Sequence, residues 1–328
     1  MIFLQIGLGS MGKRRIRCLK SLGYCEIIGY DIKKDRRKEV EENYEIKTIS
    51  SLENLNFNKI NSIIISTPPD MHSKYIEIAL QKKKPSFVEA SVILEGLERI
   101  KKIAKKKDIL IAPSCTMKFH PAIREIKNIV ESRKYGKVTN FSYHSGQYLP
   151  DWHPWENVQD FYVSKKETGG CREIVPFELT WIVDIFGFPK KIFGYFGKTM
   201  NIGADIDDTY AISIDFVNSF GSMTVDVVSR YATRSLILNM EYGQVIWKWE
   251  ENIVKLFEVL NKRWIYYYSP QGESAEGYNK NIIENMYIDE TKSFIEAASG
   301  KGKFPNSLNE DIEILKLLED IEKSNEHK

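Results

Sequence analysis

The hydrophobic positions of residues 1–120 alternate between short apolar runs and longer amphipathic segments. The apolar runs are nearly continuous, as expected for strands that are buried on both faces of a parallel sheet. They span residues 1–6, 25–30, 61–67, 86–90 and 109–114. The segments between them have helical periodicity and span residues 11–22, 33–43, 71–83 and 94–107. This alternation predicts an α/β domain with a parallel sheet and right-handed crossovers.

From about residue 137 the hydrophobic period shifts towards two. In residues 209–217, Ile212, Ile214 and Phe216 share one face, and Ser213 and Asp215 share the other. The pattern predicts an antiparallel sheet with one covered face. Its strands are expected at 192–199, 209–217, 221–229, 235–249 and 263–269. The other face is available for a second subunit.

Two domains follow from this change of period. We expect a dinucleotide-binding domain at 1–120 and an α+β domain for substrate binding and oligomerisation at 121–328. The last segment, about 307–325, has apolar residues at a spacing of three and predicts a helix that packs back on the first domain.

A glycine loop follows the first predicted strand and opens the first helix. Residues 7–12 read GLGSMG, so Gly7, Gly9 and Gly12 fit G-x-G-x-x-G, with Ser10 and Met11 between them. Gly7 permits the tight turn, Gly9 lets the backbone approach a pyrophosphate, and Gly12 allows close packing of helix and strand. The free N–H groups at the helix start bind phosphate.

An acid at the end of the second strand completes the dinucleotide motif. Asp31 lies 19 residues after Gly12. A carboxylate at this place accepts hydrogen bonds from ribose hydroxyls and repels a 2′-phosphate, which favours NAD over NADP. Arg36 and Arg37 keep NADP open, because an arginine nearby pairs with the additional phosphate.

Net charge, the length of apolar runs and the cysteine spacing limit the kinds of binding partner that the sequence predicts. The net charge of +2 gives no indication of nucleic-acid binding, and no run of 18 apolar residues predicts a membrane span. The four cysteines lack metal-ligand spacing, so we expect reduced thiols in a cytoplasmic protein.

Several segments, taken with this organisation, resemble the glucose–fructose oxidoreductase family, Gfo/Idh/MocA. They are GLGSMGKRRIRCL, STPPDMHSKYIEIAL, CTMKFHPAIREIK and YLPDWHPWE, and the resemblance runs along nearly the whole chain. It implies a Rossmann domain followed by an α+β domain with a large, mostly antiparallel, open-faced sheet. It also implies that the cofactor lies along Thr67, Pro68, Pro69 and His72 and near Glu89.

The resemblance implies a reaction class as well. Members of this family oxidise or reduce one carbon of a sugar, sugar acid, cyclitol or nucleotide sugar with NAD(P), and they form dimers or tetramers. The segment YLPDWHPWE is similar to a branch associated with surface-sugar metabolism, nonulosonic acids included. We therefore expect a sugar-like substrate and a homodimer or homotetramer built through the C-terminal sheet.

Two departures from the family pattern affect catalysis. Ala90 stands where the family carries the lysine of Glu-Lys-Pro. In GGCREIVPFELTW, Ile174 stands at the place of the family's acid and Phe177 at that of its catalytic histidine. Hydride transfer to or from an alcohol requires a group that exchanges the hydroxyl proton, so another residue must supply it.

The candidates for that group are Glu173, Glu178, Lys118 and His153. If Pro176 opens a helix at its first position, Glu178 lies in the first turn, where the helix dipole favours an acid without any catalytic role. Glu173 can project towards Phe177, and Tyr162 is a further proton donor without motif support.

The candidates for substrate binding lie in the same region. They are Tyr148, Asp151, Trp155, Arg172 and Phe177. Aromatic residues of the YLPDWHPWE loop suit stacking on a sugar ring, and Arg172 suits a carboxylate or phosphate unless it pairs with a local glutamate.

Two hypotheses remain open. The first is an NAD(P)-dependent oxidoreductase on a sugar-like substrate with an unusual acid/base group. The second is a non-catalytic member that binds a dinucleotide or sugar as a sensor or partner protein, which the loss of both lysine and histidine favours.

Overall fold

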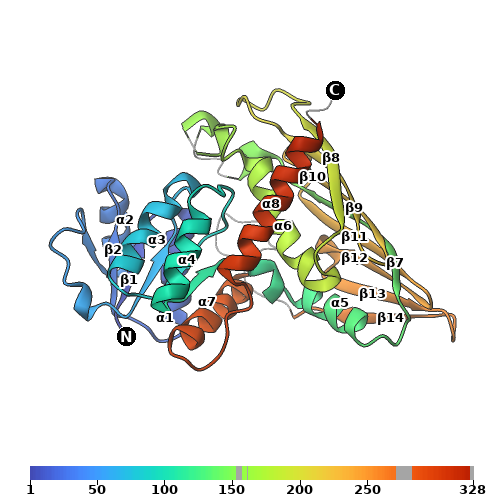
Figure 1. The fold of residues 1–328 in the computed structure, drawn as a ribbon, viewed down its shortest axis with the longest axis horizontal. Helices are drawn as coiled ribbons and strands as arrows, with labels where there is room; N and C mark the ends of the chain where they lie inside the picture. The colour runs from blue at the N-terminus through green and yellow to red at the C-terminus, as the bar shows by residue number, and fades with distance from the viewer. Residues whose placement is uncertain (153–156, 161, 271–282, 326–328) are drawn as a thin grey trace. The chain divides into compact units, whose positions relative to one another are not determined.

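The chain forms two compact units in a computed structural model that describes residues 1–152, 157–160, 162–270 and 283–325. Unit 1 contains Met1–Thr116 and Tyr287–Glu313, and unit 2 contains Met117–Met286 and Ile314–Lys328. Figure 1 shows the elements of each unit with their labels.

Unit 1 is built on a parallel six-stranded sheet of order β3-β2-β1-β4-β5-β6 within the described residues. Its strands are β1 (Phe3–Ile6), β2 (Ile27–Tyr30), β3 (Lys47–Ile49), β4 (Ser62–Ile65), β5 (Ser86–Val88) and β6 (Ile111–Pro113). Its helices are α1 (Ser10–Ser21), α2 (Lys34–Tyr44), α3 (His72–Gln81), α4 (Leu97–Lys107) and α7 (Glu284–Ala298), of which α7 begins three residues before the unit boundary. The predicted doubly wound Rossmann domain is confirmed.

The sheet order places a topological switch point between β1 and β4. Every residue of β1 and of β4 is buried, in agreement with the continuous apolar runs that predicted these strands. Chain order runs outward from β1 to β3 on one side and from β4 to β6 on the other. Ligands of open parallel sheets bind in the crevice at the carboxyl ends of the strands that flank such a point.

Unit 2 is built on a mostly antiparallel eight-stranded sheet of order β14-β13-β12-β11-β7-β10-β9-β8 within the described residues, and only β7 and β10 pair in parallel. The strands are β7 (Val138–Gly146), β8 (Lys191–Gly197), β9 (Thr209–Asp215), β10 (Phe220–Asp226), β11 (Thr233–Met240), β12 (Gly243–Lys248), β13 (Ile253–Glu258) and β14 (Arg263–Tyr268). The predicted open-faced sheet is confirmed. The single run expected at 235–249 is instead the hairpin β11–β12, because Gly243 starts a new strand after Met240.

One face of this sheet is covered by helices. Helices α5 (Pro121–Glu131) and α6 (Gly170–Phe186) lie on the same side of the sheet in Figure 1, and α8 (Leu308–Asn325) follows the last loop. The strand register places a set of exposed apolar side chains together on the opposite face. They are Phe193, Tyr195, Phe220, Ile237, Trp264, Tyr266 and Tyr268.

Helix α6 corrects one expectation. It begins at Gly170, so Pro176 lies inside the helix and does not open it, and Glu178 lies in the third turn. Cys171, Val175 and Leu179 are buried at i, i+4 and i+8, so core packing holds the helix through the proline despite the backbone bond that Pro176 cannot donate. The helix ends at Phe186, and Gly187 follows with φ +81°, as the sequence predicts.

No helix in the part of the chain that the structure describes is long and apolar enough to cross a membrane.

Candidate functional site

The glycine loop of unit 1 has the geometry of a phosphate cradle. Gly7 has φ +86°, and a Cβ there would lie 2.3 Å from the carbonyl oxygen of Ser66. A Cβ on Gly12 would lie 2.0 Å from the carbonyl oxygen of Gly7. Helix α1 starts after Gly9, and no side chain within the described ranges caps it. A helix start without a side-chain cap directs its first N–H groups, those of Met11 and Gly12 among them, towards an anion.

Asp31 lies beside this loop at the end of β2. Its Oδ2 accepts a hydrogen bond from the backbone N–H of Leu8 at 2.8 Å, and its Oδ1 accepts one from Lys33 at 2.9 Å. These bonds hold the carboxylate in place and leave lone pairs for ribose hydroxyls. Arg36 Nη1 lies 3.8 Å from Asp31 Oδ2 and reaches over Gly9. Arg37 donates to the carbonyl oxygen of Asp31 at 2.7 Å and so is bound to the backbone.

A second group of polar residues lies at the ends of β4 and β5. Thr67, Pro68 and Pro69 follow β4, and η2 (Pro69–Met71) leads into α3 at His72. The Nε2 of His72 lies 2.9 Å from the carbonyl oxygen of Thr67, and its Nδ1 lies 3.4 Å from Ser91 Oγ. Since a carbonyl only accepts, Nε2 carries the proton and Nδ1 accepts. Burial lowers the pKa of His72 to about 4, so the ring is neutral at pH 7.

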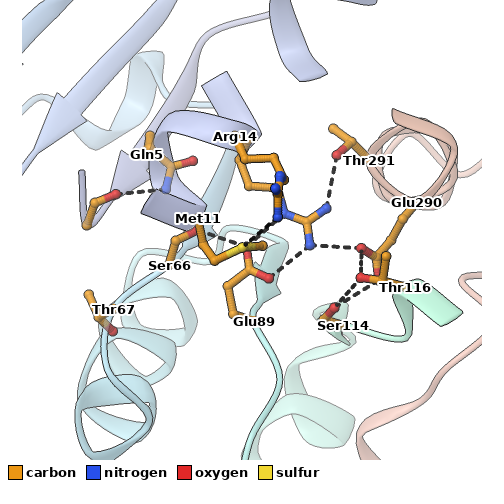
Figure 2. A network of polar contacts seen from close by, with 12 residues as sticks. Gln5, Met11, Arg14, Ser66, Thr67, Glu89, Ser114, Thr116, Glu290 and Thr291 are labelled. Atoms are coloured by element: carbon orange, nitrogen blue, oxygen red, sulfur yellow. Dashed lines mark hydrogen bonds and ion pairs between the residues drawn. The ribbon is translucent and has the colours of Figure 1, made fainter. Parts of the chain in front are cut away.

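Glu89, at the end of β5, belongs to a buried ion network (Figure 2). Arg15 donates to both of its oxygens, at 2.7 and 2.9 Å, and Arg15 Nη2 also lies 2.8 Å from Glu290 Oε2. The guanidinium of Arg15 is fully buried. Burial by itself lowers the pKa of Arg15, but Glu89 and Glu290 raise it well above its ordinary value, so the ion pairs persist. Glu89 is thus held by protein groups on the side facing α1.

In unit 2, the first turns of α6 bring Glu173 against Tyr162, which lies in η6 (Tyr162–Ser164). The phenolic Oη of Tyr162 donates to both carboxylate oxygens of Glu173, at 3.0 and 2.9 Å. Both side chains are half-buried. Thr168 holds the tyrosine backbone by donating to the carbonyl oxygen of Tyr162 at 2.7 Å. The pair is a hydrogen-bonded acid/base couple with access to solvent.

Glu178 lies on another face of α6 and is fully buried. Its oxygens accept hydrogen bonds from Tyr143, Ser145 and Trp181, at 2.7, 3.0 and 2.8 Å. Arg234 Nε completes the set at 2.8 Å. Four donors satisfy this carboxylate and neutralise its charge, which is the arrangement of a structural ion pair.

Two further charged candidates of unit 2, Arg172 and Lys118, pair with acids that are distant in the sequence. Arg172 forms a two-pronged pair with Glu322 of α8, with N–O distances of 2.6 and 3.0 Å. Lys118, in η3 (Thr116–Phe119), lies 3.5 Å from Asp184 Oδ1. Since Asp184 is 11 residues after Glu173 on the same helix, Lys118 is engaged roughly 16 Å further along the helix axis. The structure therefore does not bring Lys118, Glu173 and Glu178 together.

The predicted substrate loop is described in part. Tyr148 stands at the start of η4 (Leu149–Asp151) with the guanidinium of Arg230 3.9 Å above its ring, and Asp151 is exposed. Phe177 is half-buried on α6. His153 and Trp155 lie outside the described residues.

Sequence reasoning missed the partners of these residues. Arg15, Glu290 and Arg234 carry no motif, and each makes its contacts with residues distant in the chain. The sequence does contain one signal for Arg15: it lies three and four residues before Cys18 and Leu19. This helical spacing puts Arg15 on the same, buried face of α1.

The residues of unit 1 fit a dinucleotide. The glycine loop has no room for side chains at Gly7 and Gly12, and the start of α1 carries no side-chain cap within the described residues. In the described part of the chain, Thr67 Oγ1 is buried without a hydrogen-bond partner, at the edge where the cofactor binds in this fold. Gly7–Gly12 would hold the pyrophosphate, Asp31 the adenosine ribose, and Thr67 the other half.

Comparison with known proteins agrees with this geometry. Residues 2–113 match the model of the Gfo/Idh/MocA family, described as an oxidoreductase family with an NAD-binding Rossmann fold. No curated protein matches the sequence.

Solved structures share the fold over the whole chain. An oxidoreductase from Agrobacterium radiobacter, in complex with NAD+, L-tartaric acid and magnesium, is 16% identical with a TM-score of 0.86 and covers 100% of this chain and 96% of its own. Levoglucosan dehydrogenase in complex with NADH is 15% identical with a TM-score of 0.84 and covers 99% and 96%. GenD2 from gentamicin A biosynthesis, in complex with NAD, is 12% identical with a TM-score of 0.80 and covers 100% and 94%. At these identities the likeness concerns the fold.

Proposed function

Because residues 2–113 belong to the NAD-binding Rossmann domain of the Gfo/Idh/MocA oxidoreductase family, we propose that the protein is an NAD-dependent dehydrogenase or reductase. Its substrate is a CH–OH group of a sugar, sugar acid or nucleotide sugar. The observation that carries the proposal is the intact cofactor half: an uncapped α1 behind a glycine cradle, with Asp31 held at the end of β2. A phosphate-binding loop with this geometry has little use without a nucleotide.

The substrate class is supported by similarity. One of the proteins with this fold is a levoglucosan dehydrogenase, whose solved structures include complexes with NADH and levoglucosan and with NADH and L-sorbose. The YLPDWHPWE segment resembles a branch of surface-sugar metabolism, and its described tyrosine, Tyr148, presents a ring that is stacked under Arg230. Rings of this kind bind sugar faces, and an arginine beside them binds an acid group of the sugar.

Glu173 is the acid/base group that its own surroundings on α6, within unit 2, support best. It lies in the first turn of α6, close to Ile174 and Phe177, the positions where the family carries its acid and its histidine. Its side chain is half-buried, whereas that of Glu178 is fully buried. A bound nicotinamide cofactor would supply the hydride acceptor for oxidation or the hydride donor for reduction. In oxidation, the carboxylate of Glu173 takes the proton of the substrate hydroxyl, and in reduction it returns it. Tyr162 fixes the orientation of the carboxylate.

The exposed apolar face of the unit 2 sheet supports a homodimer or homotetramer that is built through this sheet. Seven large apolar side chains are exposed on that face, from Phe193 on β8 to Tyr268 on β14. A monomer rarely keeps such a patch in water, and a second copy of the same sheet covers it. Light scattering of the purified protein measures the mass directly. A monomer at micromolar concentration would contradict this assignment.

The cofactor part is tested by titration with NADH and NADPH, followed by nicotinamide fluorescence. We expect NADH binding that Asp31→Ala weakens by about tenfold, since the variant removes two hydrogen bonds to ribose hydroxyls. No binding of either cofactor would overturn the proposal.

Catalysis is tested on a panel of sugars, sugar acids and nucleotide sugars. We expect Glu173→Gln to lower kcat by about a hundredfold or more with NADH affinity unchanged, as loss of a general base does. Glu167→Gln, an exposed acid six residues earlier, is the matched control and should retain activity. Full activity of Glu173→Gln would remove Glu173 from the mechanism. Inactivity of the wild type on the whole panel, with NADH bound, would favour a non-catalytic sensor or partner protein.

A further inference from the structure

The turn after β4 is held from three directions. The carbonyl oxygen of Ser66 lies against Gly7, where even a Cβ would come within 2.3 Å. Ser66 Oγ donates to Glu89 Oε1 at 3.0 Å, and His72 Nε2 donates to the carbonyl oxygen of Thr67 at 2.9 Å. These contacts fix where Thr67 stands. Its Oγ1 is buried and has no hydrogen-bond partner among the described residues.

One of these contacts continues far beyond the turn. Arg15 Nε and Nη2 donate to the two carboxylate oxygens of Glu89, and Nη2 also binds Glu290 on α7 (Figure 2). Glu290 is anchored in turn at the end of β6, where it accepts hydrogen bonds from Ser114 Oγ at 3.0 Å, the N–H of Cys115 at 2.6 Å and Thr116 Oγ1 at 2.7 Å. The chain Ser66–Glu89–Arg15–Glu290, here called the relay, therefore ties the β4 turn to α7.

The part of the relay formed by Ser66 and Glu89 lies on the β4–β5 side of the switch point. Asp31, at the end of β2, marks the side that receives the adenosine ribose, and the glycine loop after β1 receives the pyrophosphate. The other mononucleotide half must extend over β4 and β5, where Ser66 and Thr67 follow β4 and Glu89 follows β5. Ser66 and Glu89 thus border the place of the nicotinamide half, whereas Asp31 follows β2 on the other side of the switch point.

We propose that Arg15 and Glu290 are positioning residues for the nicotinamide half of the cofactor. They act through Glu89 and Ser66 and hold Thr67 Oγ1 where it meets the nicotinamide itself, the part of that half that ADP-ribose lacks. The proposal rests on the NAD site proposed above. It gives Glu89 and His72 an indirect role: both bind the β4 turn rather than the cofactor. It also assigns a function to α7, about 200 residues distant from β5 in the sequence.

The test compares two ligands that differ only in the nicotinamide, NADH and ADP-ribose. Glu290→Gln keeps the size of the side chain and removes the charge that binds Arg15. Glu296→Gln is the matched control, because it is an exposed acid on the same helix. We expect Glu290→Gln to raise the Kd for NADH about three- to tenfold, the effect of one or two weakened hydrogen bonds, with the Kd for ADP-ribose unchanged within about twofold. Glu296→Gln should leave both ligands unaffected.

A general loss of structure would affect both ligands alike, so the ratio of the two Kd values separates positioning from stability. Ser66→Ala provides a second test at the other end of the relay, with little risk to folding because it deletes one hydroxyl. It too should weaken NADH and spare ADP-ribose. The proposal is overturned if NADH and ADP-ribose weaken equally in both variants, or if neither variant changes the Kd for NADH. If Glu290→Gln fails to fold, Ser66→Ala decides. A wild type that binds no NADH would instead overturn the proposed function.

Discussion

Glu178 offers a direct test of how a buried acid is used in this fold. It was a candidate base, yet the structure surrounds it with four donors from β7, β11 and α6. If it is structural, replacing it removes a counter-charge from the core. The informative variant is Glu178→Ala, which leaves the guanidinium of Arg234 and the donors of Tyr143 and Trp181 without their acceptor.

The magnitude follows from burial. The side chain of Glu178 is fully enclosed and that of Arg234 is 13% exposed. Breaking a buried ion pair by removing one partner costs about 3–5 kcal/mol, because the remaining charge stays desolvated. We therefore expect the free energy of unfolding of unit 2 to fall by about 4 kcal/mol. For a unit of roughly 150–250 residues this corresponds to a decrease in Tm of about 10 °C.

The assay can follow unit 2 alone, because all six tryptophans of the chain lie between residues 117 and 286. Urea unfolding observed by tryptophan fluorescence then avoids a two-state treatment of the whole protein. Glu131→Ala is the control, since its side chain is 61% exposed and its effect should stay within about 0.5 kcal/mol. A Glu178→Ala protein within about 1 kcal/mol of the wild type would refute the structural assignment. Normal stability with lost turnover would make Glu178 catalytic.

Three further outcomes are expected. Gly12→Ala should abolish NADH binding in the fluorescence titration with circular dichroism unchanged, because the new methyl would stand 2.0 Å from the Gly7 carbonyl and the loop must move. Arg36→Ala should weaken NADPH several-fold and leave NADH unaffected in the same titration, since this arginine reaches over Gly9; equal effects would contradict its assignment. His120→Asn should flatten the pH dependence of unit 2. Burial, and then the charge of Arg234, lower the pKa of His120 to about 3. Below pH 6.5 the unfolded state binds a proton that the folded state does not, so the stability present above pH 6.5 is lost as the pH falls towards 3. Between pH 7 and 5 the wild type should lose about 2 kcal/mol more than the variant, whose asparagine still caps α5; parallel urea curves would contradict this.

The cofactor half could be predicted from sequence because its determinants are local. The positive φ of Gly7, the uncapped start of α1 and the strand that precedes them lie within a dozen residues, and each follows from residue type. Asp31 required only the knowledge that neighbouring parallel strands end at the same edge. Hydrophobic period also sufficed for the two sheets, since it reports which face of each strand is buried.

The start of α6 shows where local rules fail. A proline favours the first turn of a helix, so Pro176 misplaced the start by six residues. What holds the helix through the proline is the burial of Cys171 and Val175, which depends on a sheet formed elsewhere in the chain.

Charged residues show the same limit more strongly. Glu173 and Glu178 are five residues apart on one helix and look equivalent in the sequence, but one meets the hydroxyl of Tyr162 and the other meets Arg234, 56 residues away. Whether a carboxylate is a base or a core ion depends on its partners and its access to water. Those partners lie on η6, β7 and β11, so the role of each carboxylate depends on how these segments pack against α6. Backbone conformation and hydrophobic period, in contrast, are determined by neighbouring residues in the sequence.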